Sequence, residues 1–398
     1  MIPGFAFKSR DFGIGKDIAI KIKDIRPPYV EANEADNVET SNYNLNKLSK
    51  FIVHKGEFLL AMTGATIGKI GRYICEEPAY VNQRVLKFED AGLISYDYLY
   101  YYLSTNVFQT FISNHIDSQS AQPNISSSTI GKYLIKAPSI KEQKRIASIL
   151  SSLDDKIELN RRINDNLEQQ AQALFKSWFV DFEPFKDGEF VESELGMIPK
   201  GWCATVLEEL CSFISRGLTP KYDENSDELI LGQTCVRNNI VTLDNARRHK
   251  PKQRTEKWVQ QWDTLINSTG VGSLGRVGIA YFDMDNVAID SHITVVRPKS
   301  ALVRHYVGRN LLSRQLEIEN MAVGSTGQTE LPKERVKSLP ILLPDDNTLI
   351  RFNAIIEPIA YQLYRNIEES RRLAPLRDTL LPHLMSGELK VNEIENAI

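Results

Sequence analysis

The stretch that decides the fold covers residues 142–179 and reads EQKRIASILSSLDDKIELNRRINDNLEQQAQALFKSWF. Its seam positions follow at alternating steps of four and three residues, uninterrupted by Pro or Gly: Ile146, Leu150, Leu153, Ile157, Asn160, Asn164, Leu167, Ala171, Leu174 and Trp178. This spacing is that of a coiled coil. About 39 helical residues at 1.5 Å each span roughly 58 Å, which predicts a strut helix. The alternative is a long buried helix of one large domain, but the two Asn and the charged flanks favour the strut.

A second segment after Pro344 repeats this step pattern. Its seam positions are Phe352, Ile356, Ile359, Leu363, Asn366, Ser370, Leu373, Arg377, Leu380 and Leu384. The segment also contains Pro358, Pro375 and Pro382, and each proline removes a helix hydrogen bond. We therefore expect this second helix to kink or to end early.

The two halves of the chain form an internal repeat at a shift of 206 residues. Matched landmarks include Thr63 with Thr269, Gly64 with Gly270, Gln122 with Gln328, Pro138 with Pro344, and Asn160 with Asn366. Identities exceed chance only modestly, so the order of features carries the argument. Each half runs strand, Thr-Gly loop, helix (96–115 in the first half), Gln loop, Pro and long helix. The globular parts of the two halves (the heads) have diverged, whereas the long helices match. This pattern suggests two recognition domains with different targets.

The repeat leaves a gap at the start of the chain. Residues 196–215 precede Arg216–Thr219 in the second half, whereas the corresponding residues 4–7 begin the first half almost at once. We expect that the first head lacks an opening strand and helix. The alternative is that the tail, residues 386–398, supplies part of that role.

Length and composition indicate an ordinary protein of several domains. A chain of 398 residues predicts two to three domains, and contents of 42% hydrophobic and 25% charged residues are those of a soluble protein. No apolar run is long enough to span a membrane, and the N-terminus lacks the apolar core of a signal peptide. We therefore expect a cytoplasmic protein. Residues 181–202, rich in Gly, Pro and acids, are expected to form a linker.

The four cysteines do not suggest a metal site or a disulfide framework. Cys75, Cys203, Cys211 and Cys235 show no C-x-x-C spacing and have no paired His nearby. We expect them to be buried free thiols.

Charge gives a mixed indication about nucleic acid. The net charge is −3 and the pI about 6.2, which does not point to a nucleic-acid binder. Residues 245–257, NARRHKPKQRTEK, nevertheless concentrate cations against one Glu: Arg247, Arg248, Lys250, Lys252, Arg254 and Lys257. Such a cluster can contact phosphates, and the alternative is a solvated loop.

The Gly-rich loops do not match an ATP-binding motif. Residues 64–69, GATIGK, are one residue too short for G-x-x-x-x-G-K-[ST], and Ile70 replaces the Ser or Thr that would hold magnesium. The matching loop of the second half carries Arg276 instead of Lys. We predict a tight turn that brings Lys69 or Arg276 and backbone N–H groups close to a phosphate. A plain hairpin is the alternative.

No other motif forms a catalytic constellation. Arg26-Pro27-Pro28-Tyr29 differs from the amino-methyltransferase signature, because Arg cannot accept from the target amine, and no F-x-G-x-G loop is present. E-x-K occurs at 142–144 and 388–390 without a suitable Pro-Asp partner, and the six His are scattered. We therefore predict no enzyme activity, no metal and no cofactor in this chain. A purified chain that methylated DNA alone would revive the enzyme hypothesis.

Polar residues at matched loop positions favour recognition of DNA bases. Asn82-Gln83-Arg84 matches Asp290-Ser291-His292, and both follow a predicted strand. Asn, Gln, Arg and His can read base edges, although each residue singly is more often structural. The candidate DNA-binding residues are Thr63, Gly64, Thr66, Lys69, Asn82, Gln83, Arg84, Gln122, Asn124, Arg216, Thr219, Arg247, Arg248, Lys250, Thr269, Gly270, Ser273, Arg276, Ser291, His292 and Gln328.

The chain resembles a specificity subunit of a type I restriction–modification system. The motifs that carry the resemblance are LLAMTGATIGKIG (59–71), YVNQR (80–84), the string from IKAPSIKEQKRIA to KSWFVDFEPF (135–185), ESELGMIPKGW (192–202), STGQTELPKERV (325–336) and LRDTLLPHLMSGEL (376–389). Together they cover nearly the whole chain.

The resemblance implies an α+β fold. Two α/β target-recognition domains in a pseudo-twofold repeat would be separated by two long helices forming an antiparallel coiled coil. The implied parts are a first recognition domain, short at its N-terminus (1–140), a central spacer helix (141–184), a second recognition domain (185–344), and a distal helix with the tail (345–398).

The resemblance also implies the function and the partners. Each recognition domain would bind one half of a bipartite site on double-stranded DNA. Two modification (methyltransferase) subunits would dock on the frame, and restriction subunits would join them. S-adenosylmethionine, ATP and Mg would be bound by those partners. The alternatives are the specificity subunit of a related bipartite-site system outside type I, or a non-catalytic coiled-coil DNA-binding scaffold.

The seam residues alone do not choose the helix direction. Antiparallel pairing about the midpoints places Asn164 opposite Asn366 and Asn160 opposite Ser370, whereas parallel pairing places Asn160 opposite Asn366. Either arrangement makes a polar layer that costs stability and fixes the register.

Overall fold

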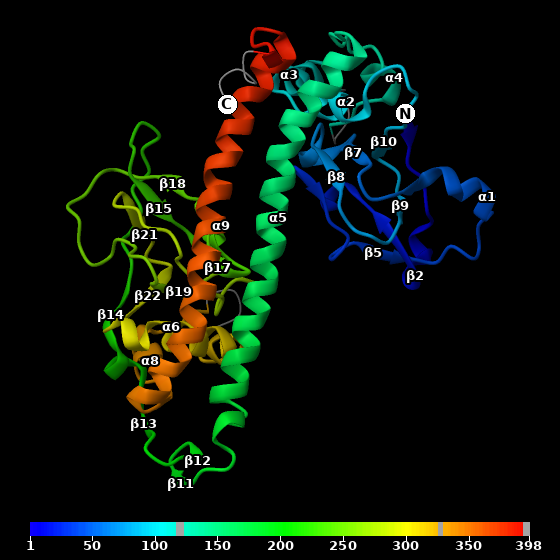
Figure 1. Cartoon of the computed structure of the whole chain (residues 1–398). Coiled ribbons are helices and arrows are strands. Elements are labelled where there is room, and N and C mark those ends of the chain that lie inside the picture. Colours follow the sequence, from blue (N-terminus) through cyan, green and yellow to red (C-terminus); the bar gives the residue numbers. More distant parts are fainter. Residues whose placement is uncertain (117–122, 325–328, 393–398) are drawn as a thin grey trace. The chain divides into compact units, whose positions relative to one another are not determined.

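The computed structural model describes residues 1–116, 123–324 and 329–392. The chain forms two compact units, one of Met1–Asp155 with Leu373–Ile398 and one of Lys156–Arg372. Two long helices, α5 (Ile140–Phe179) and α9 (Asp346–Ser386), contribute to both units (Figure 1). Each unit therefore combines one sheet-bearing part of the chain with a portion of both helices.

The described residues of the first unit form two sheets. The larger has the order β1 (Ile2–Pro3), β10 (Val85–Lys87), β7 (Phe58–Ala61), β8 (Ile70–Tyr73), β4 (Tyr29–Val30) and β3 (Ile25–Arg26). The smaller has the order β5 (Asp36–Val38), β2 (Phe12–Ile20), β9 (Ala79–Val81) and β6 (Ile52–Val53). Every residue of β7 is buried, as its continuous apolar sequence predicts.

In the second unit, the residues that the structure describes form a six-stranded sheet and three smaller ones. The large sheet has the order β14 (Cys211–Arg216), β22 (Ile293–Pro298), β19 (Thr264–Asn267), β20 (Val277–Ile279), β17 (Asn239–Val241) and β16 (Val236–Arg237). The others are β18 (Arg247–Arg248) with β15 (Leu229–Leu231) and β21 (Val287–Ile289), β13 (Cys203–Val206) with β23 (Pro340–Leu343), and β11 (Phe190–Ser193) with β12 (Gly196–Pro199).

The two six-stranded sheets have the same strand order, position for position, which confirms the internal repeat. Equivalent pairs also share their direction: β4 runs parallel to β8, as β17 does to β20. The turn of Pro27-Pro28 is therefore an ordinary hairpin between β3 and β4, matched by the β16–β17 hairpin of the second unit.

Short helices complete both units. They are α1 (Leu45–Leu48), α2 (Tyr96–Leu103), α3 (Asn106–Asn114) and α4 (Ser127–Ile130) in the first, and α6 (Ala301–Ser313), α7 (Gln315–Asn320) and α8 (Lys333–Lys337) in the second. The single helix expected over residues 96–115 is thus two helices. Thr105 causes the break, because its side chain caps α3 by accepting a hydrogen bond from the backbone N–H of Phe108.

Single-turn 3-10 helices mark several connections. They are η1 (Ser9–Asp11), η2 (Ile22–Asp24), η3 (Ser49–Phe51) and η4 (Gly64–Thr66) in the first unit, and η5 (Glu183–Phe185), η6 (Leu207–Leu210) and η7 (Gln233–Cys235) in the second. The expected linker over 181–202 is in fact structured, because η5 and the β11–β12 hairpin lie within it. Phe182 and Phe185, which lie within this stretch, pack against the core of the second unit.

The helix pair is antiparallel, as its hydrogen bonds show. In the second unit the Asn366 Nδ2 donates to Asn164 Oδ1 over 2.8 Å, and Asn160 Nδ2 donates to Ser370 Oγ over 3.3 Å. In the first unit Arg377 pairs with Asp154 over 2.7 Å. These contacts select the antiparallel register and confirm the predicted fold class.

Burial along both helices follows the predicted seam. Ile146, Leu150, Asn160, Trp178, Phe352, Ile356, Leu363, Asn366 and Leu384 are buried, and Leu153, Ile157, Asn164, Leu167, Leu174, Ile359 and Leu373 are half-buried. The buried stripe also includes Ala147 and Phe175, outside the heptad positions. The stripe is wider than a two-helix seam because, within each unit, the helices also pack against the sheet-bearing part.

The expectation that the second helix would end early is wrong. Helix α9 is continuous over 41 residues despite Pro358, Pro375 and Pro382. All three prolines are exposed, and so are the residues four positions before each of them. Water can therefore satisfy the carbonyl groups that the prolines leave without a donor, while the opposite face of the helix packs undisturbed.

The expectation that all four cysteines are buried is wrong. Of the four cysteines only Cys235 is buried, and Cys203 is exposed on the short strand β13. In the first unit, the tail residues Leu389 and Val391 pack in the core beside α2 and α5. The tail thus takes part in that core, although no strand among the described residues of the first unit corresponds to β13.

Candidate nucleic-acid interface

The Thr-Gly loop of the first unit is a hairpin connection between antiparallel strands. It joins β7 to β8, with Gly64 and Gly68 at φ values of 74° and 80°. A side chain at Gly68 would meet Gln109 of α3 at 2.8 Å, so this position requires glycine for two reasons. A phosphate-binding loop of the ATPase type leads from a strand into a helix, and this loop does not.

Backbone hydrogen bonds bring three loops of the first unit together at this hairpin. Met62 N–H donates to the Arg84 carbonyl over 2.8 Å, and Ile125 N–H donates to the Met62 carbonyl over 3.0 Å. Gln83 N–H donates to the Phe5 carbonyl over 2.8 Å. The loop at 82–84 is therefore held between the start of the chain and the Thr-Gly loop.

The second unit repeats these hydrogen bonds at equivalent positions. Ser268 N–H donates to the His292 carbonyl over 2.9 Å, and Leu331 N–H donates to the Ser268 carbonyl over 2.8 Å. Ser291 N–H donates to the Leu218 carbonyl over 2.7 Å. The structure thus brings together the matched loop residues that the sequence singled out, once in each unit.

Side chains on this shared frame differ between the units. In the first unit Gln83 and Arg84 are exposed. At the equivalent positions of the second unit, Ser291 is half-buried and His292 is exposed. Arg84 has a φ of 74°, a conformation that costs a non-glycine residue about 1–3 kcal/mol and concentrates at functional sites. His292 Nδ1 lies 2.9 Å from Thr269 Oγ1, which orients the ring.

Several predicted site residues have structural roles. Thr63 is buried and its hydroxyl donates to the Pro123 carbonyl over 2.9 Å. Asn82 is also buried. Arg216 donates to the Leu331 carbonyl over 2.8 Å and pairs with Glu330 over 2.9 Å. Its guanidinium therefore connects the end of β14 to the loop that contains Glu330 and Leu331. Side chains held in this way are poorly placed to reach a base edge.

The remaining loop residues are more accessible. Lys69 and Arg276 are exposed at the end of the hairpins, where Arg276 also donates to the Gly272 carbonyl over 2.7 Å. Thr66 and Ser273 are half-buried. Asn124 is half-buried and forms a bridge with the buried Thr63, while Gln122 and Gln328 lie outside the described residues.

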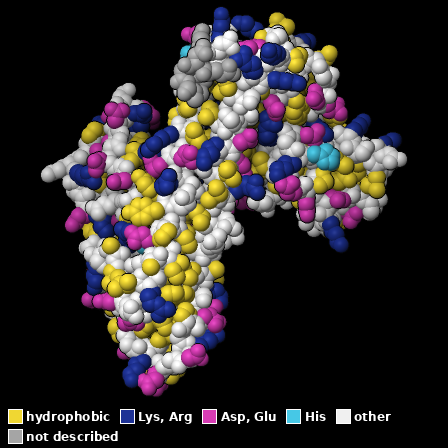
Figure 2. Space-filling model, in the orientation of Figure 1, with side chains coloured by type: hydrophobic (Ala, Val, Ile, Leu, Met, Phe, Trp, Pro, Cys, Tyr) yellow, Lys and Arg dark blue, Asp and Glu magenta, His cyan; other side chains and the backbone are white. Residues whose placement is uncertain are grey.

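The basic segment of the second unit is partly a strand rather than only a solvated loop. Arg247 and Arg248 form β18, where Arg247 stacks at 3.4 Å on Tyr222 and Arg248 pairs with Asp227 over 3.4 Å. Lys250 is exposed, and the Thr219 carbonyl accepts from Lys252. Lys and Arg side chains are interspersed with acids on the face that Figure 2 shows.

The strand pairing shows which residue of the first unit occupies the position equivalent to Arg247. Arg247 pairs with Ile230 as Asp36 pairs with Ala19, in equivalent strands. Asp36 forms ion pairs with Lys21 and Lys23, so the first unit carries a carboxylate where the second carries a guanidinium. The two surfaces differ in charge at one structural position.

Gln233 lies in the candidate site, and sequence reasoning missed it. Its Nε2 donates to Thr269 Oγ1 over 2.7 Å, and its carbonyl accepts from Asn267 over 3.0 Å. The equivalent position in the first unit is Ile22, which lies against Gly64 as Gln233 lies against Gly270. A shift of 206 residues does not align these two positions, so the comparison of the halves could not reveal them.

A buried ionic cluster anchors α5 within the second unit. Arg309 Nη1 lies 2.6 Å from Glu168 Oε1, outside hydrogen-bond geometry, and Arg309 Nη2 donates to the Tyr281 hydroxyl over 2.7 Å. Asn239 Nδ2 donates to the same carboxylate oxygen over 3.3 Å. Burial lowers the pKa of nearby His305 to about 3, and Arg304 and Arg309 add to that effect. The ring is therefore neutral at pH 7.

No metal or membrane chemistry is apparent in the described part of the chain. Within residues 1–116, 123–324 and 329–392, no group of three or more His, Cys, Asp or Glu is placed to hold a metal ion. None of the described helices is both long and apolar enough to cross a membrane.

The two units share one topology, and each presents its own side chains from the same backbone frame. This arrangement defines a two-headed recognition protein. A family model described as the type I restriction modification DNA specificity domain matches residues 15–169. The type I restriction enzyme MjaIX specificity subunit of Methanocaldococcus jannaschii is 30% identical over 380 residues, which cover 92% of this chain and 84% of that protein. The chain belongs to the family of type I restriction–modification specificity subunits, and its function is DNA sequence recognition.

Other relatives agree with this membership. The HindI specificity subunit of Haemophilus influenzae is 23% identical over 367 residues, covering 75% of this chain and 79% of that protein. A crystal structure of the type I restriction–modification S subunit from M. genitalium shares the fold, with a TM-score of 0.55 and 15% identity over 96% of this chain and 92% of that one. As a specificity subunit, the chain is the non-catalytic member of its system.

Proposed function

We propose that each unit reads one half of a bipartite site on double-stranded DNA. The observation that carries this proposal is the shared backbone frame with different side chains, Gln83 and Arg84 in one unit and Ser291 and His292 in the other. Different side chains at one position of a common frame discriminate different bases, because Arg and Gln make bidentate contacts that Ser and His do not.

Phosphate contacts would position the protein on the duplex. Lys69, Arg276 and Lys250 are exposed cations on or near the loops of the two frames. Such cations contribute affinity that falls with salt, but they carry no direct sequence information. The buried candidates Thr63 and Asn82, and the tethered Arg216, would support the loops rather than touch the DNA.

The paired helices would provide the frame for partner subunits. Two modification subunits and the restriction subunits would assemble on this chain, and they would bind S-adenosylmethionine, ATP and Mg. This chain would contribute the choice of sequence and no chemical step.

Substituting Arg84 tests the proposal most directly. Arg84→Gly removes the candidate reader and relieves the positive φ, so the backbone frame should persist. We expect the methylation pattern in cells that carry the partner subunits to relax at one position of one half-site. Arg84→Lys keeps the charge but loses the planar bidentate fork, so it should relax the same position if the geometry of the guanidinium, rather than its charge, reads the base. An unchanged pattern, or changes in both half-sites, would contradict the assignment.

A further inference from the structure

A chain of side-chain hydrogen bonds in the second unit ends at His292. Gln233 Nε2 donates to the Thr269 carbonyl and, over 2.7 Å, to Thr269 Oγ1. Thr269 Oγ1 in turn lies 2.9 Å from His292 Nδ1. These three residues form what we call the Gln233 relay, which leads from two half-buried side chains to an exposed ring.

The Thr269 carbonyl sets the direction of the first hydrogen bonds in the relay. A carbonyl oxygen can only accept, so the part of the Gln233 side chain that faces it must be the NH₂ group rather than the amide oxygen. That group has two hydrogens. One is donated to the Thr269 carbonyl and the other to Thr269 Oγ1, which is therefore an acceptor toward Gln233.

The Thr269 hydroxyl then donates to His292. A hydroxyl carries a single hydrogen, and because Gln233 donates to Oγ1, that hydrogen is available for His292 Nδ1. Nδ1 must be unprotonated in order to accept it. The proton of the neutral ring is then on Nε2, because the hydrogen bond at one ring nitrogen decides which nitrogen carries the proton.

The surroundings hold both ends of the relay in place. Asn267 is fully buried, and its Nδ2 donates to the Gln233 carbonyl over 3.0 Å. A Cβ atom at Gly270, which has a φ of 100°, would approach Gln233 Nε2 to 2.7 Å, so the amide requires glycine there. At the other end, the backbone N–H of His292 donates to Asp290 Oδ1 over 2.9 Å.

The first unit has a different arrangement at the equivalent positions. Thr63 donates its hydroxyl hydrogen to a backbone carbonyl over 2.9 Å, and Ile22 stands where Gln233 stands. Arg84 occupies the position of His292, and a guanidinium can only donate. A group that can only donate needs no relay to select its protonation state, whereas an imidazole does.

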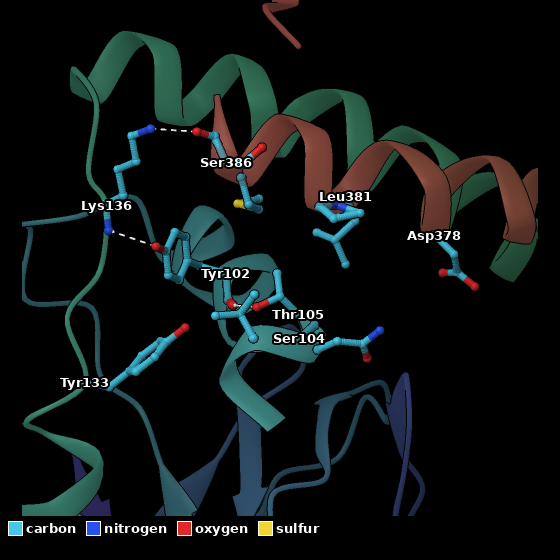
Figure 3. A pocket seen from close by; sticks show the side chains of 12 residues that line it. Tyr102, Ser104, Thr105, Tyr133, Lys136, Asp378, Leu381 and Ser386 are labelled. Carbon is cyan, nitrogen blue, oxygen red and sulfur yellow. Dashed lines mark hydrogen bonds between the residues drawn. The ribbon is translucent and has the colours of Figure 1, made fainter. Parts of the chain in front are cut away.

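Polar groups around a cavity of about 540 Å³ in the first unit serve a different purpose (Figure 3). The Lys136 N–H donates to the Tyr102 hydroxyl over 3.0 Å, and Lys136 Nζ donates to the Ser386 carbonyl over 2.6 Å. The Thr105 hydroxyl donates to the Tyr102 carbonyl over 2.8 Å. These hydrogen bonds secure the backbone around the cavity, whereas the Gln233 relay ends on an exposed imidazole.

We propose that the Gln233 relay makes His292 a hydrogen-bond donor, through Nε2–H, to an acceptor atom on the edge of a DNA base. Guanine O6 and N7, adenine N7 and thymine O4 are such acceptors in the major groove, whereas cytosine offers only a donor there. Gln233 and Thr269 are positioning residues, because they act through His292. The inference rests on the proposed function, since it takes His292 as a residue that reads the DNA.

Nitrogen NMR of the full chain tests the relay without DNA. Spectra of protein with isotope-labelled histidine distinguish a protonated ring nitrogen from an unprotonated one, and the His292→Gln variant identifies the His292 signals among the six histidines. On the alkaline plateau of the titration, where the ring is neutral, we expect Nδ1 of His292 to be unprotonated. A protonated Nδ1 would overturn the inference.

Three variants test the roles of Gln233 and Thr269. Gln233→Met removes the donor and Thr269→Val removes the hydroxyl at similar side-chain size. Each should lower the ratio of the Nε2–H to the Nδ1–H tautomer by about fivefold, as expected for the loss of one hydrogen bond. Thr269→Ser is the matched control, because it keeps the hydroxyl and should keep the ratio. If Gln233→Met fails to fold, the two Thr269 variants still decide, and equal ratios in both would overturn the inference.

Methylation in cells that carry the partner subunits tests the reading of DNA. His292→Ala should relax one base pair of one half-site, and Gln233→Met should lower discrimination at the same base pair by about fivefold. An unchanged pattern in His292→Ala would overturn the proposed function of this loop and the inference with it. A change in His292→Ala that Gln233→Met does not share would overturn the inference alone.

Discussion

The buried pair of Arg309 and Glu168 offers a sharp test of how α5 is anchored in the second unit. Their side chains are only 2% and 12% exposed. Arg309→Met removes the cation and leaves a buried carboxylate without its charge partner, which costs about 3–5 kcal/mol. Replacing both residues, as Glu168→Leu with Arg309→Met, removes both charges at once. We therefore expect the double variant to be more stable than Arg309→Met alone.

Tryptophan fluorescence can follow this unit alone. All four tryptophans, Trp178, Trp202, Trp258 and Trp262, belong to the second unit. Urea unfolding monitored at the tryptophans should show the midpoint of Arg309→Met falling by at least about 1 M, since slopes are typically near 1–3 kcal/mol per molar urea. The double variant should recover part of that loss, while Tyr281 and Asn239 still lose a partner.

An exposed ion pair of the same unit provides the control. Lys186 and Glu183 are 2.8 Å apart with side chains 58% and 52% exposed. Lys186→Met should change the unfolding free energy by less than about 1 kcal/mol. If the double variant is no more stable than Arg309→Met alone, or if Arg309→Met costs no more than Lys186→Met, the reasoning about the buried pair is refuted.

Three other outcomes can be measured. Burial lowers the pKa of His305 to about 3, below the unfolded value near 6.5, so the protein loses stability as the pH falls below 6.5. From pH 7 to pH 5 the free energy of unfolding should fall by about 2 kcal/mol. Urea unfolding of His305→Gln should not show this pH-dependent loss. Exchanging Gln83-Arg84 for Ser-His should alter the methylated half-site of the first head only, and a shift in both half-sites would contradict that. Deleting four residues from the middle of α5 removes about 6 Å of rise, so sequencing of methylated sites should show a shorter spacer between half-sites, and an unchanged spacer would count against a ruler role.

The heptad pattern predicted the long helices well because their seam depends on local spacing. The sequence could not choose the helix direction, since Asn160 and Asn164 make polar layers in both arrangements, and only the partners Asn366 and Ser370 decide it. The expectation that the prolines would interrupt the second helix was wrong. All three prolines lie on the exposed face of α9, and which face is exposed depends on how the helix packs.

The candidate site was predictable in position but not in detail. Strand order, the Thr-Gly hairpins and the matched loops follow from the repeat. The offset, however, varies along the chain: it is 213 residues at Phe5 and Leu218, 206 at Met62 and Ser268, and 208 at Val81 and Ile289. These changes hid Gln233. The tethering of Arg216 to Glu330 depends on a contact distant in sequence, which no local pattern reveals.

The backbone frame around Gln83, Arg84, Ser291 and His292 has a consequence for how recognition sequences diversify. Its hydrogen bonds use main-chain atoms, so they persist whatever side chains occupy these exposed or half-buried positions. Substitutions at exposed positions without backbone strain, such as Gln83, usually change stability by less than about 0.5 kcal/mol. If these positions read the DNA, as proposed, a lineage can acquire a new target by a few point mutations while the backbone frame stays intact.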